Sequence, residues 1–325
     1  MRTDRSREAR GRSRRRREPP IERRTVDGVL LLDKPSGITS NAALQRVKWL
    51  FRARKAGHTG SLDPLASGML PLCFGQATKI SAYLLDADKT YRVTMRVGAR
   101  TDTADADGQV VEESAVNTIE REALEAALER FRGEIMQVPP MYSALKKDGK
   151  RLYELARAGE VVEREPRPVT IYDLRVDTWD AAEPELLVRC SKGTYIRTLV
   201  EDIAAAAGTL AHVAALRRLA VSPFAESGLI TMAELESAAE NEEGALDALL
   251  RPIDEAICDW PEATLNAEQV FYLLRGNPVQ AQIPDVPGLI RIYDENRRFL
   301  GLGEDLGGGR LAPRRLFVER VGEEN

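Results

Sequence analysis

The chain has 325 residues, 43% of them hydrophobic and 30% charged, which excludes a peptide or mini-scaffold and leaves room for one large domain or two smaller ones. No apolar run approaches the roughly 20 residues that cross a bilayer, so an integral membrane protein is not expected. The formal net charge of -4 combines two unlike segments. Residues 1–24 hold eleven arginines against four acidic residues, a charge of +7, which leaves -11 for the rest of the chain.

Residues 1–25 are predicted to form a disordered, arginine-rich tail, because a run of like charges cannot bury itself. The tail lacks the apolar core of a signal peptide and the Ser-rich, acid-poor make-up of a transit sequence, so a cytoplasmic protein is expected. Two interpretations stay open. The tail is a solvated extension without a specific role, or it is an electrostatic arm that raises encounter rate and affinity for a phosphate backbone.

Cysteine and histidine usage argues against metal and disulfide chemistry. The three cysteines, Cys73, Cys190 and Cys258, are an odd number without a CxxC pair, which disfavours both a disulfide framework and a zinc site. Only His58 and His212 are present, so a multi-histidine metal centre is excluded. We expect no metal site and no cofactor.

Strands are predicted here from apolar runs and period-two alternation, and helices from apolar residues every three to four positions after an N-cap. In chain order, we predict a strand at 28–33, a helix at 40–54 capped by Ser40, a Gly-rich stretch over 57–75, a strand at 89–98, a helix at 117–131 capped by Asn117, a basic and partly helical insertion at 133–168, strands at 169–179 and 186–190, an alanine-rich helix ending at 207, a strand at 212–220 and a helix at 234–250.

Pro252 marks the predicted start of a second domain. The chain beyond it is Gly- and Pro-rich and strand-like at 289–293, 299–302 and 316–319. A unit of about 70 residues is near the lower limit of independent stability. The predicted domains are therefore 26–251 and 252–325.

The most unusual segment is 57–68, with the sequence Gly-His-Thr-Gly-Ser-Leu-Asp-Pro-Leu-Ala-Ser-Gly. Its glycines and proline allow tight backbone geometry around one carboxylate, Asp63. A carboxylate in an apolar-flanked loop can act as a nucleophile or a base, although a turn-forming Asp is the commoner case. The glycines match neither GxGxxG nor GxxxxGK[ST], and no serine lies in GxSxG, so nucleotide-binding and hydrolase sites are not supported.

This segment resembles the motif G-H-x-G-x-L-D-P-x-A-x-G-x-L of the TruB family, bacterial synthases of pseudouridine 55 in tRNA. Five further stretches resemble family motifs in order and spacing. They are DKPSGITS at 33–40, KTY at 89–91, PPMYSALK at 139–146, GTYIR at 193–197 and HVAALRR at 212–218. Together they cover roughly residues 28 to 230, and chance agreement of six separated motifs is very improbable.

The resemblance implies an α+β fold, with a pseudouridine synthase catalytic domain around a mixed, mostly antiparallel sheet. A small, β-rich C-terminal domain resembles the PUA domain, an RNA-binding module, at RGNP (275–278) and GLG (301–303). The implied activity is isomerisation of uridine to pseudouridine at position 55 in the T-loop of tRNA, with the base flipped out of the loop and no cofactor. The expected partner is tRNA, with no membrane and no obligate protein partner, and the expected state is a monomer.

The resemblance also assigns the chemistry to a few residues. By position, Asp63 is the family's essential carboxylate, and Arg197 is the partner that stabilises its charged form. Whether Asp63 adds to C1′ of the sugar or supports a glycal intermediate stays open. Lys34 resembles a motif lysine, for which we expect structural support of the Tyr91 region rather than chemistry.

Four further residues match positions that bind the flipped base. Tyr91 matches the family tyrosine that stacks on the base, and Tyr195 and Leu216 match positions that line its pocket. His58 matches the histidine that helps to displace the base from its pairing in the loop.

The insertion at 133–168 resembles the thumb that closes over the T stem-loop, although on charge alone a solvated helix explains it equally well. One alternative function is a guide-RNA-dependent pseudouridine synthase, which the intact insertion disfavours. The other is a non-catalytic tRNA-binding or folding factor, which the joint presence of Asp63, Tyr91 and Arg197 disfavours.

Deleting residues 1–24 is expected to weaken tRNA binding mainly at low salt, because an exposed cationic arm acts through screened electrostatics. The measurement is equilibrium binding of a tRNA transcript to the full chain and to the deletion variant over a series of salt concentrations. An affinity that is unchanged at every concentration would leave the tail as a passive extension.

Overall fold

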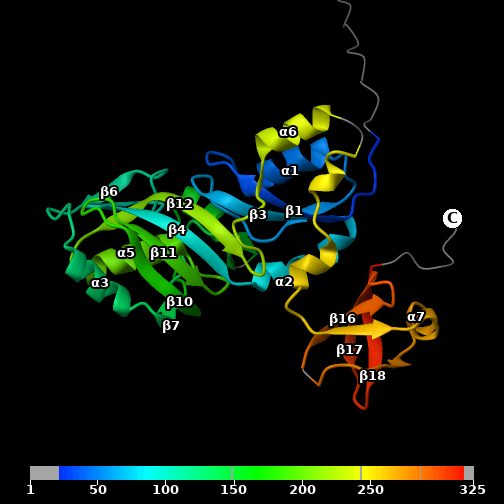
Figure 1. Ribbon diagram of the computed structural model, residues 1–325. Helices are drawn as coiled ribbons and strands as arrows, with labels where there is room; N and C mark the ends of the chain where they lie inside the picture. The colour runs from blue at the N-terminus through cyan, green and yellow to red at the C-terminus, as the bar shows by residue number, and fades with distance from the viewer. Residues whose placement is uncertain (1–21, 148, 242–243, 286, 318–325) are drawn as a thin grey trace, which may run out of the picture.

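The computed structural model describes residues 22–147, 149–241, 244–285 and 287–317. Figure 1 shows a larger sheet flanked by helices and a smaller, curled sheet near the C-terminus. Within those residues, none of the helices combines the length and the apolar character needed to cross a membrane.

The larger sheet has nine strands within the described residues, and its pairing is antiparallel except for β1 with β13 and β3 with β12. In spatial order its strands are β13 (Ile230–Thr231), β1 (Gly28–Lys34), β3 (Ser67–Phe74), β12 (Ala211–Val221), β4 (Lys89–Val97), β11 (Glu185–Cys190), β10 (Arg167–Thr178) and β7 (Gly133–Gln137), with β2 (Ala56–His58) beside β3. The predicted mixed, mostly antiparallel sheet of an α+β protein is confirmed.

Helices cover both faces of the sheet at its β1 and β3 end. Helices α1 (Ser40–Leu50) and α6 (Met232–Glu240) pack on the face that carries Leu30 and Leu32. Helix α2 (Ser81–Asp86) and the 3₁₀ turn η3 (Ile253–Ile257) pack on the other face. A strand buried on both faces has a continuous apolar sequence, which is why β1 reads as an unbroken run.

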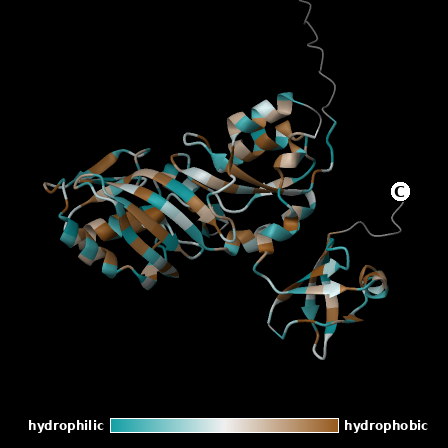
Figure 2. Cartoon of the chain, viewed as in Figure 1, coloured by the Kyte–Doolittle hydropathy of each residue, from teal (hydrophilic) through white to brown (hydrophobic). Residues whose placement is uncertain are grey.

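At the other end of the sheet only one face is covered. Helices α3 (Arg121–Glu129) and α5 (Ile196–Ala206) pack against Val93 and Met95 of β4, while Arg92 and Arg96 point outward and pair with acidic side chains of the neighbouring strands and turns. Figure 2 shows this pattern as alternating brown and teal bands along the strands. The period-two alternation predicted β4 for this physical reason.

The predicted insertion leaves the sheet between β7 and β10. It contains a short hairpin of β8 (Lys146–Lys147) and β9 (Lys150–Arg151), followed by α4 (Leu152–Arg157). A second hairpin, β5 (Ala99–Thr101) with β6 (Val110–Glu113), lies after β4. The insertion is therefore partly helical, as its sequence predicts.

The smaller sheet packs around its own apolar core and also touches the larger one. Its elements are β14 (Glu262–Leu265), α7 (Ala267–Leu273), β15 (Val279–Gln280), β16 (Leu289–Asp294), β17 (Phe299–Asp305) and β18 (Arg310–Leu316). Leu302 joins the core that contains Val29 and Leu31 of β1. The rings of Tyr83 and Trp260 meet edge to face at 4.7 Å beside it. The two sheets therefore share one apolar cluster.

Two predicted N-caps are wrong. The N-cap of α1 is Thr39, whose side chain accepts a hydrogen bond from the backbone N–H of Ala42 at 3.1 Å. Ser40 is buried, and its hydroxyl bonds the backbone of Leu62 instead. Asn117 caps no helix, because α3 begins further along the chain. A side chain already used in a tertiary contact is not available as a cap.

Two predicted helix ends are too late. Helix α1 stops at Leu50 rather than Arg54, because Arg52 has a φ of +50° and turns the chain out of the helix. Helix α6 stops at Glu240, where Asn241 is extended, and a 3₁₀ turn η2 (Asp247–Leu249) follows later. Another 3₁₀ turn, η1 (Gly75–Lys79), comes directly after β3.

The stretch at 57–75, predicted only as Gly-rich, contains β3, a long central strand that the sequence analysis missed. Seven of its eight residues are buried, so it shows no period-two alternation. The strand predicted at 316–319 is also misplaced, because β18 ends at Leu316 and residues beyond 317 lie outside the described part.

The predicted tail at 1–25 is wrong at its C-terminal end. The backbone N–H of Arg24 donates to Arg52 at 2.9 Å, and the N–H of Arg54 donates to the carbonyl of Arg24 at 3.0 Å. The Arg24 guanidinium also bonds both carboxylate oxygens of Asp247 at 2.6 Å. Residues 22–25 are thus tied to the folded body, and 1–21 lie outside the described residues.

Replacing Leu302 with Ala is expected to lower the free energy of unfolding by about 2–5 kcal/mol, because it leaves a cavity in the cluster shared by the two sheets. Urea denaturation followed by tryptophan fluorescence measures this change. Leu306→Ala is the matched control, since Leu306 directly follows β17, is 52% exposed, and its loss is expected to cost less than about 0.5 kcal/mol. Equal losses in the two variants would contradict a shared core.

Candidate active site

Asp63 lies in the loop at 59–66 between β2 and β3, called the Asp63 loop below. On one side of Asp63, the Ser40 hydroxyl accepts from the N–H of Leu62 at 2.7 Å and donates to its carbonyl at 3.0 Å. On the other side, the carbonyl of Pro64 accepts from the N–H of Gly37 at 2.7 Å. Both anchors come from the KPSGITS segment, so two motifs that are distant in the sequence build one loop.

Lys34 secures the same loop. Its ammonium group is buried and donates to the carbonyls of Pro35 at 2.8 Å, Ile38 at 2.7 Å and Pro64 at 3.4 Å. Burial lowers the pKa of Lys34 to about 8, and the nearby Asp63 carboxylate partly opposes this shift. These hydrogen bonds support the Asp63 loop, whereas the support of the Tyr91 region expected of Lys34 stays a prediction.

Asp63 forms an ion pair with Arg197 at the start of α5. The Arg197 Nε lies 2.9 Å from Oδ2 of Asp63 and 3.7 Å from Oδ2 of Asp105. The Arg197 and Asp105 side chains are each 7% exposed, whereas the Asp63 side chain is 44% exposed. Of these three charged groups, Asp63 is therefore the one that a substrate can reach.

The two other Arg197 nitrogens also donate hydrogen bonds. Nη1 donates to the carbonyl of Thr103 at 2.7 Å, and Nη2 donates to the carbonyl of Tyr142 at 2.8 Å. A planar guanidinium held at three sites has a fixed orientation. It presents Nε to Asp63 without rearrangement.

The pKa of Asp63 reflects opposing influences. Burial raises its pKa most strongly, and the neighbouring Asp105 carboxylate raises it further. The Arg197 guanidinium acts in the other direction by attraction and by its hydrogen bond, and Lys34 adds a smaller attraction. The pKa remains above the usual value, so the guanidinium limits a rise that burial would otherwise make larger.

A second buried arginine, Arg218, was not singled out from the sequence, although it lies in the HVAALRR motif. It is 1% exposed, and its guanidinium donates to the carbonyls of Met69 at 2.7 Å and Gly60 at 3.1 Å. Its backbone explains a glycine of the DPLASG motif. A Cβ on Gly68, whose φ is +96°, would lie 2.3 Å from the carbonyl oxygen of Arg218.

The charge of Arg218 affects the pKa of both Tyr91 and His58. Tyr91 of β4 stands opposite Arg218 of β12 in the sheet register, and burial raises its pKa while Arg218 lowers it. Burial and the Arg218 charge both lower the pKa of His58. Nδ1 of His58 is buried, and nothing in the described part of the chain hydrogen-bonds to it.

Tyr195 is positioned by Gln137, which the sequence also failed to single out. The Gln137 side chain is 2% exposed, accepts from the N–H of Tyr195 at 2.8 Å and donates to its carbonyl at 3.0 Å. Burial raises the pKa of the Tyr195 hydroxyl. Gln137 and Tyr195 lie 58 positions apart, so only the fold brings them together.

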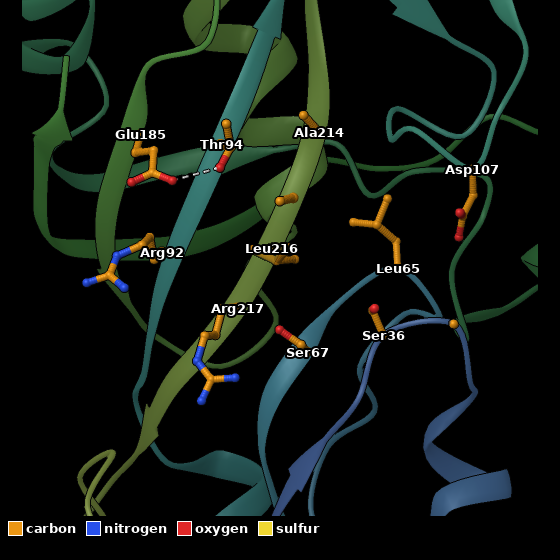
Figure 3. Close-up of a pocket in the computed structure, with 12 residues that line it drawn as sticks. Ser36, Leu65, Ser67, Arg92, Thr94, Asp107, Glu185, Ala214, Leu216 and Arg217 are labelled. Carbon is orange, nitrogen blue, oxygen red and sulfur yellow. Dashed lines mark hydrogen bonds between the residues drawn. The ribbon is translucent and has the colours of Figure 1, made fainter. Parts of the chain in front are cut away.

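Leu216 belongs to the apolar core and also lines an open cavity of about 530 Å³ (Figure 3). Leu65 of the Asp63 loop lines the same cavity, as do Arg92 of β4 and Arg217 of β12. Arg217 forms two bonds of 2.9 Å with the Asp33 carboxylate. The cavity therefore borders the loop that carries Asp63, two residues from the carboxylate.

Among the described residues, no group of three or more His, Cys, Asp or Glu side chains is arranged to hold a metal ion. The predicted site residues do converge. Asp63 with Arg197, and Tyr91 and His58 with Arg218, lie where β3, β12 and β4 meet the start of α5.

Three family models match consecutive parts of the chain. They are the TruB family pseudouridylate synthase N-terminal domain at 48–196, the tRNA pseudouridylate synthase B C-terminal domain at 197–258, and the pseudouridine synthase II TruB C-terminal region at 261–317. The chain belongs to the TruB family. Its membership agrees with the geometry of the Asp63 loop and with the six motifs.

Similar proteins and solved structures agree with this family assignment. The tRNA pseudouridine synthase B proteins of Ectopseudomonas mendocina (strain ymp) and Pseudomonas aeruginosa (strain UCBPP-PA14) are 57% and 56% identical over 298 residues, which is 91% of this chain and 96% and 97% of theirs. A Cbf5-Nop10-Gar1 complex contains a chain with a TM-score of 0.71 and 25% identity, covering 90% of this chain and 85% of that one. A chain of an H/ACA RNP bound to a substrate RNA has a TM-score of 0.70 and 23% identity. The match covers 90% of this chain and 86% of that one and shows a shared fold.

Replacing Arg197 with Met is expected to raise the pKa of Asp63 further, because burial and the Asp105 carboxylate then act without the guanidinium that opposes them. The ¹³C chemical shift of the Asp63 carboxyl, followed by NMR through a pH titration, measures this. Arg96→Met is the control, since Arg96 is exposed and pairs with Glu183. A pKa of Asp63 equal to or below that of the unaltered protein would contradict the proposed balance.

Proposed function

We propose that this protein isomerises uridine to pseudouridine at position 55 in the T-loop of tRNA and needs no guide RNA. TruB family membership and the similarity to proteins named tRNA pseudouridine synthase B support the reaction and the substrate. The observation that carries the chemistry is the Asp63 carboxylate, which is open to a substrate and paired with a buried guanidinium at 2.9 Å.

The reaction breaks the N1–C1′ bond of uridine, turns the base and forms a C5–C1′ bond. The proton leaves C5, and N1 gains one, so no external oxidant or reductant is required. Asp63 either adds to C1′ or supports a glycal intermediate, and both routes need the ionised carboxylate. Arg197 favours that form, because its three-point anchoring fixes a positive charge beside Oδ2 at no further cost in reorganisation.

We assign base binding to four residues. Tyr91 stacks on the flipped base, and Tyr195 and Leu216 form the walls of its pocket. His58 displaces the base from its pairing in the loop. The lowered pKa of His58 supports this role, since a neutral imidazole has one N–H donor and one acceptor nitrogen with which to replace the hydrogen bonds of a displaced base.

We infer that the protein acts alone and as a monomer in the cytoplasm. The solved Cbf5 chains of similar fold belong to complexes, as with Nop10 and Gar1. This chain instead carries an insertion of its own, with α4 and the β8–β9 hairpin, which we assign to gripping the T stem-loop. A purely RNA-binding role is disfavoured, because binding alone does not require a carboxylate paired with a buried arginine.

Asp63→Asn is expected to abolish turnover, with a rate loss of at least about 10³-fold, because the amide can neither attack nor carry the negative charge. Release of tritium from tRNA transcript labelled at C5 of uridine measures the reaction. Asp177→Asn removes an exposed aspartate on β10 and is expected to retain activity.

Two controls test which uridine is modified and whether the enzyme works without guide RNA or partner proteins. Tritium release by the unaltered protein is expected to disappear when the T-loop target is changed to cytidine. If release occurs only after guide RNA or partner proteins are added, the stand-alone function is wrong.

A further inference from the structure

Five basic side chains cluster where α1 ends, and none belongs to the site described above. Lys48 lies in the last turn of α1, Arg52, Arg54 and Lys55 follow the helix, and Arg23 runs alongside them. All are exposed except Lys48, which is half-buried. These five residues are called the α1-end patch below.

The charge of the patch is poorly compensated. Lys48, Arg52 and Lys55 take part in no ion pair within the described residues. Arg54 and Arg23 bond backbone carbonyls, which carry no net charge, at 3.0 and 3.3 Å. Asp247 is already engaged by Arg24. A cluster of this kind stands out on a chain whose charge outside its first 24 residues is -11.

Arg52 occupies a conformation that favours glycine. Its φ is +50°, and two hydrogen bonds close the helix end around it, from the N–H of Arg52 to Trp49 at 3.0 Å and from the N–H of Ala53 to Lys48 at 3.1 Å. Glycine is the usual residue in such a helix end, because a Cβ is strained at positive φ. An arginine here places a charge on the surface where glycine would be the more stable choice.

A purely structural reading explains only part of the cluster. Cations in the last turn of a helix interact favourably with its dipole, which accounts for Lys48. The other four basic residues of the patch lie beyond that turn, where the dipole has little effect. Most of the patch therefore needs another explanation, and a phosphate backbone supplies the complementary charge.

Helix α1 fixes the distance between the patch and the Asp63 loop. Ser40, at the first turn, bonds Leu62 next to Asp63, and the eleven-residue helix packs rigidly on the sheet. At 1.5 Å per residue, the helix separates the patch from the loop by about 16 Å. The patch is thus too far away to touch the flipped base, but it is close enough to reach another part of the same RNA.

The patch and the insertion lie at opposite ends of the large sheet. The insertion leaves from β7 and β10, while α1 covers β1 and β3 (Figure 1). If the insertion holds the T stem, the patch faces tRNA outside the T stem-loop. Arg23 belongs to the patch, and nine further arginines precede it in the sequence. The arginine-rich N-terminal segment is therefore covalently continuous with the patch.

We propose that the α1-end patch binds phosphates of tRNA outside the T stem-loop, as a second contact about one helix length from the Asp63 loop. This inference rests on the proposed function. The contact adds affinity for whole tRNA without reading sequence, because lysine and arginine on the phosphate backbone position an RNA rather than specify it.

The test compares Lys48→Gln/Arg52→Gln/Lys55→Gln with Arg96→Gln/Arg121→Gln/Arg130→Gln, which removes the same charge from the far end of the large sheet. Binding of full-length tRNA transcript and of an isolated T stem-loop is measured by fluorescence anisotropy over a salt series. The patch variant is expected to lose about 10-fold in affinity for tRNA near 0.1 M salt, with a salt slope lower by about 2 to 3. Its affinity for the T stem-loop is expected to stay unchanged.

Arg52→Gly separates binding from stability. It is expected to raise the melting temperature, since it relieves the positive φ, and to weaken tRNA binding at low salt. A purely structural role for Arg52 predicts that tRNA affinity does not fall.

The proposal is overturned if the patch and control variants bind tRNA with equal affinity and salt slope, or if the patch variant loses affinity equally for the T stem-loop. Loss of binding to anionic phosphatidylserine vesicles, with tRNA binding unchanged, would assign the surface to a membrane instead. Tritium release from the T stem-loop reports the proposed function separately, so activity there with no effect of the patch on tRNA binding rejects only the second contact.

Discussion

The ion pair between Asp63 and Arg197 is the contact on which the site depends. An arginine that is 7% exposed cannot remain in the core without compensation, because a buried charge without a partner is strongly destabilising. Arg197 meets this requirement with two carboxylates and two backbone carbonyls, which come from three other segments of the chain. The start of α5, the Asp63 loop, the β5–β6 turn and the insertion are thereby drawn to one point.

Two buried arginines, Arg197 and Arg218, affect different ionisable groups of the site. Arg197 lies against carboxylates and favours the charged form of Asp63, whereas Arg218 bonds two backbone carbonyls and the Tyr91 side chain and forms no ion pair among the described residues. That charge lowers the pKa of His58 and Lys34 and opposes the rise in the pKa of Tyr91. The surroundings of Asp63 thus combine one reachable carboxylate with two buried positive charges, which suits a polyanionic substrate.

The net charge of this molecule does not describe its surface, because the basic residues are concentrated in a few places. The net charge of -4 conceals a basic N-terminal segment, a basic stretch at 146–157 of the insertion and the α1-end patch on an otherwise acidic body. The rigid packing of α1 against β1 and β3 sets the spacing between the patch and the Asp63 loop. Motifs identify the family, and the fold determines where each positive surface can meet RNA.

The sequence by itself determined the Asp63 loop, the family and the strands with one solvated face, such as β4, because local spacing and alternation carry that information. It did not reveal β3, whose burial on both faces removes the alternation, nor the true N-cap of α1, since Ser40 serves Leu62 instead. Only the tertiary structure could place Arg218, Gln137 and Asp105 in the site. Their partners lie tens of residues away, and no local pattern encodes a contact between distant segments.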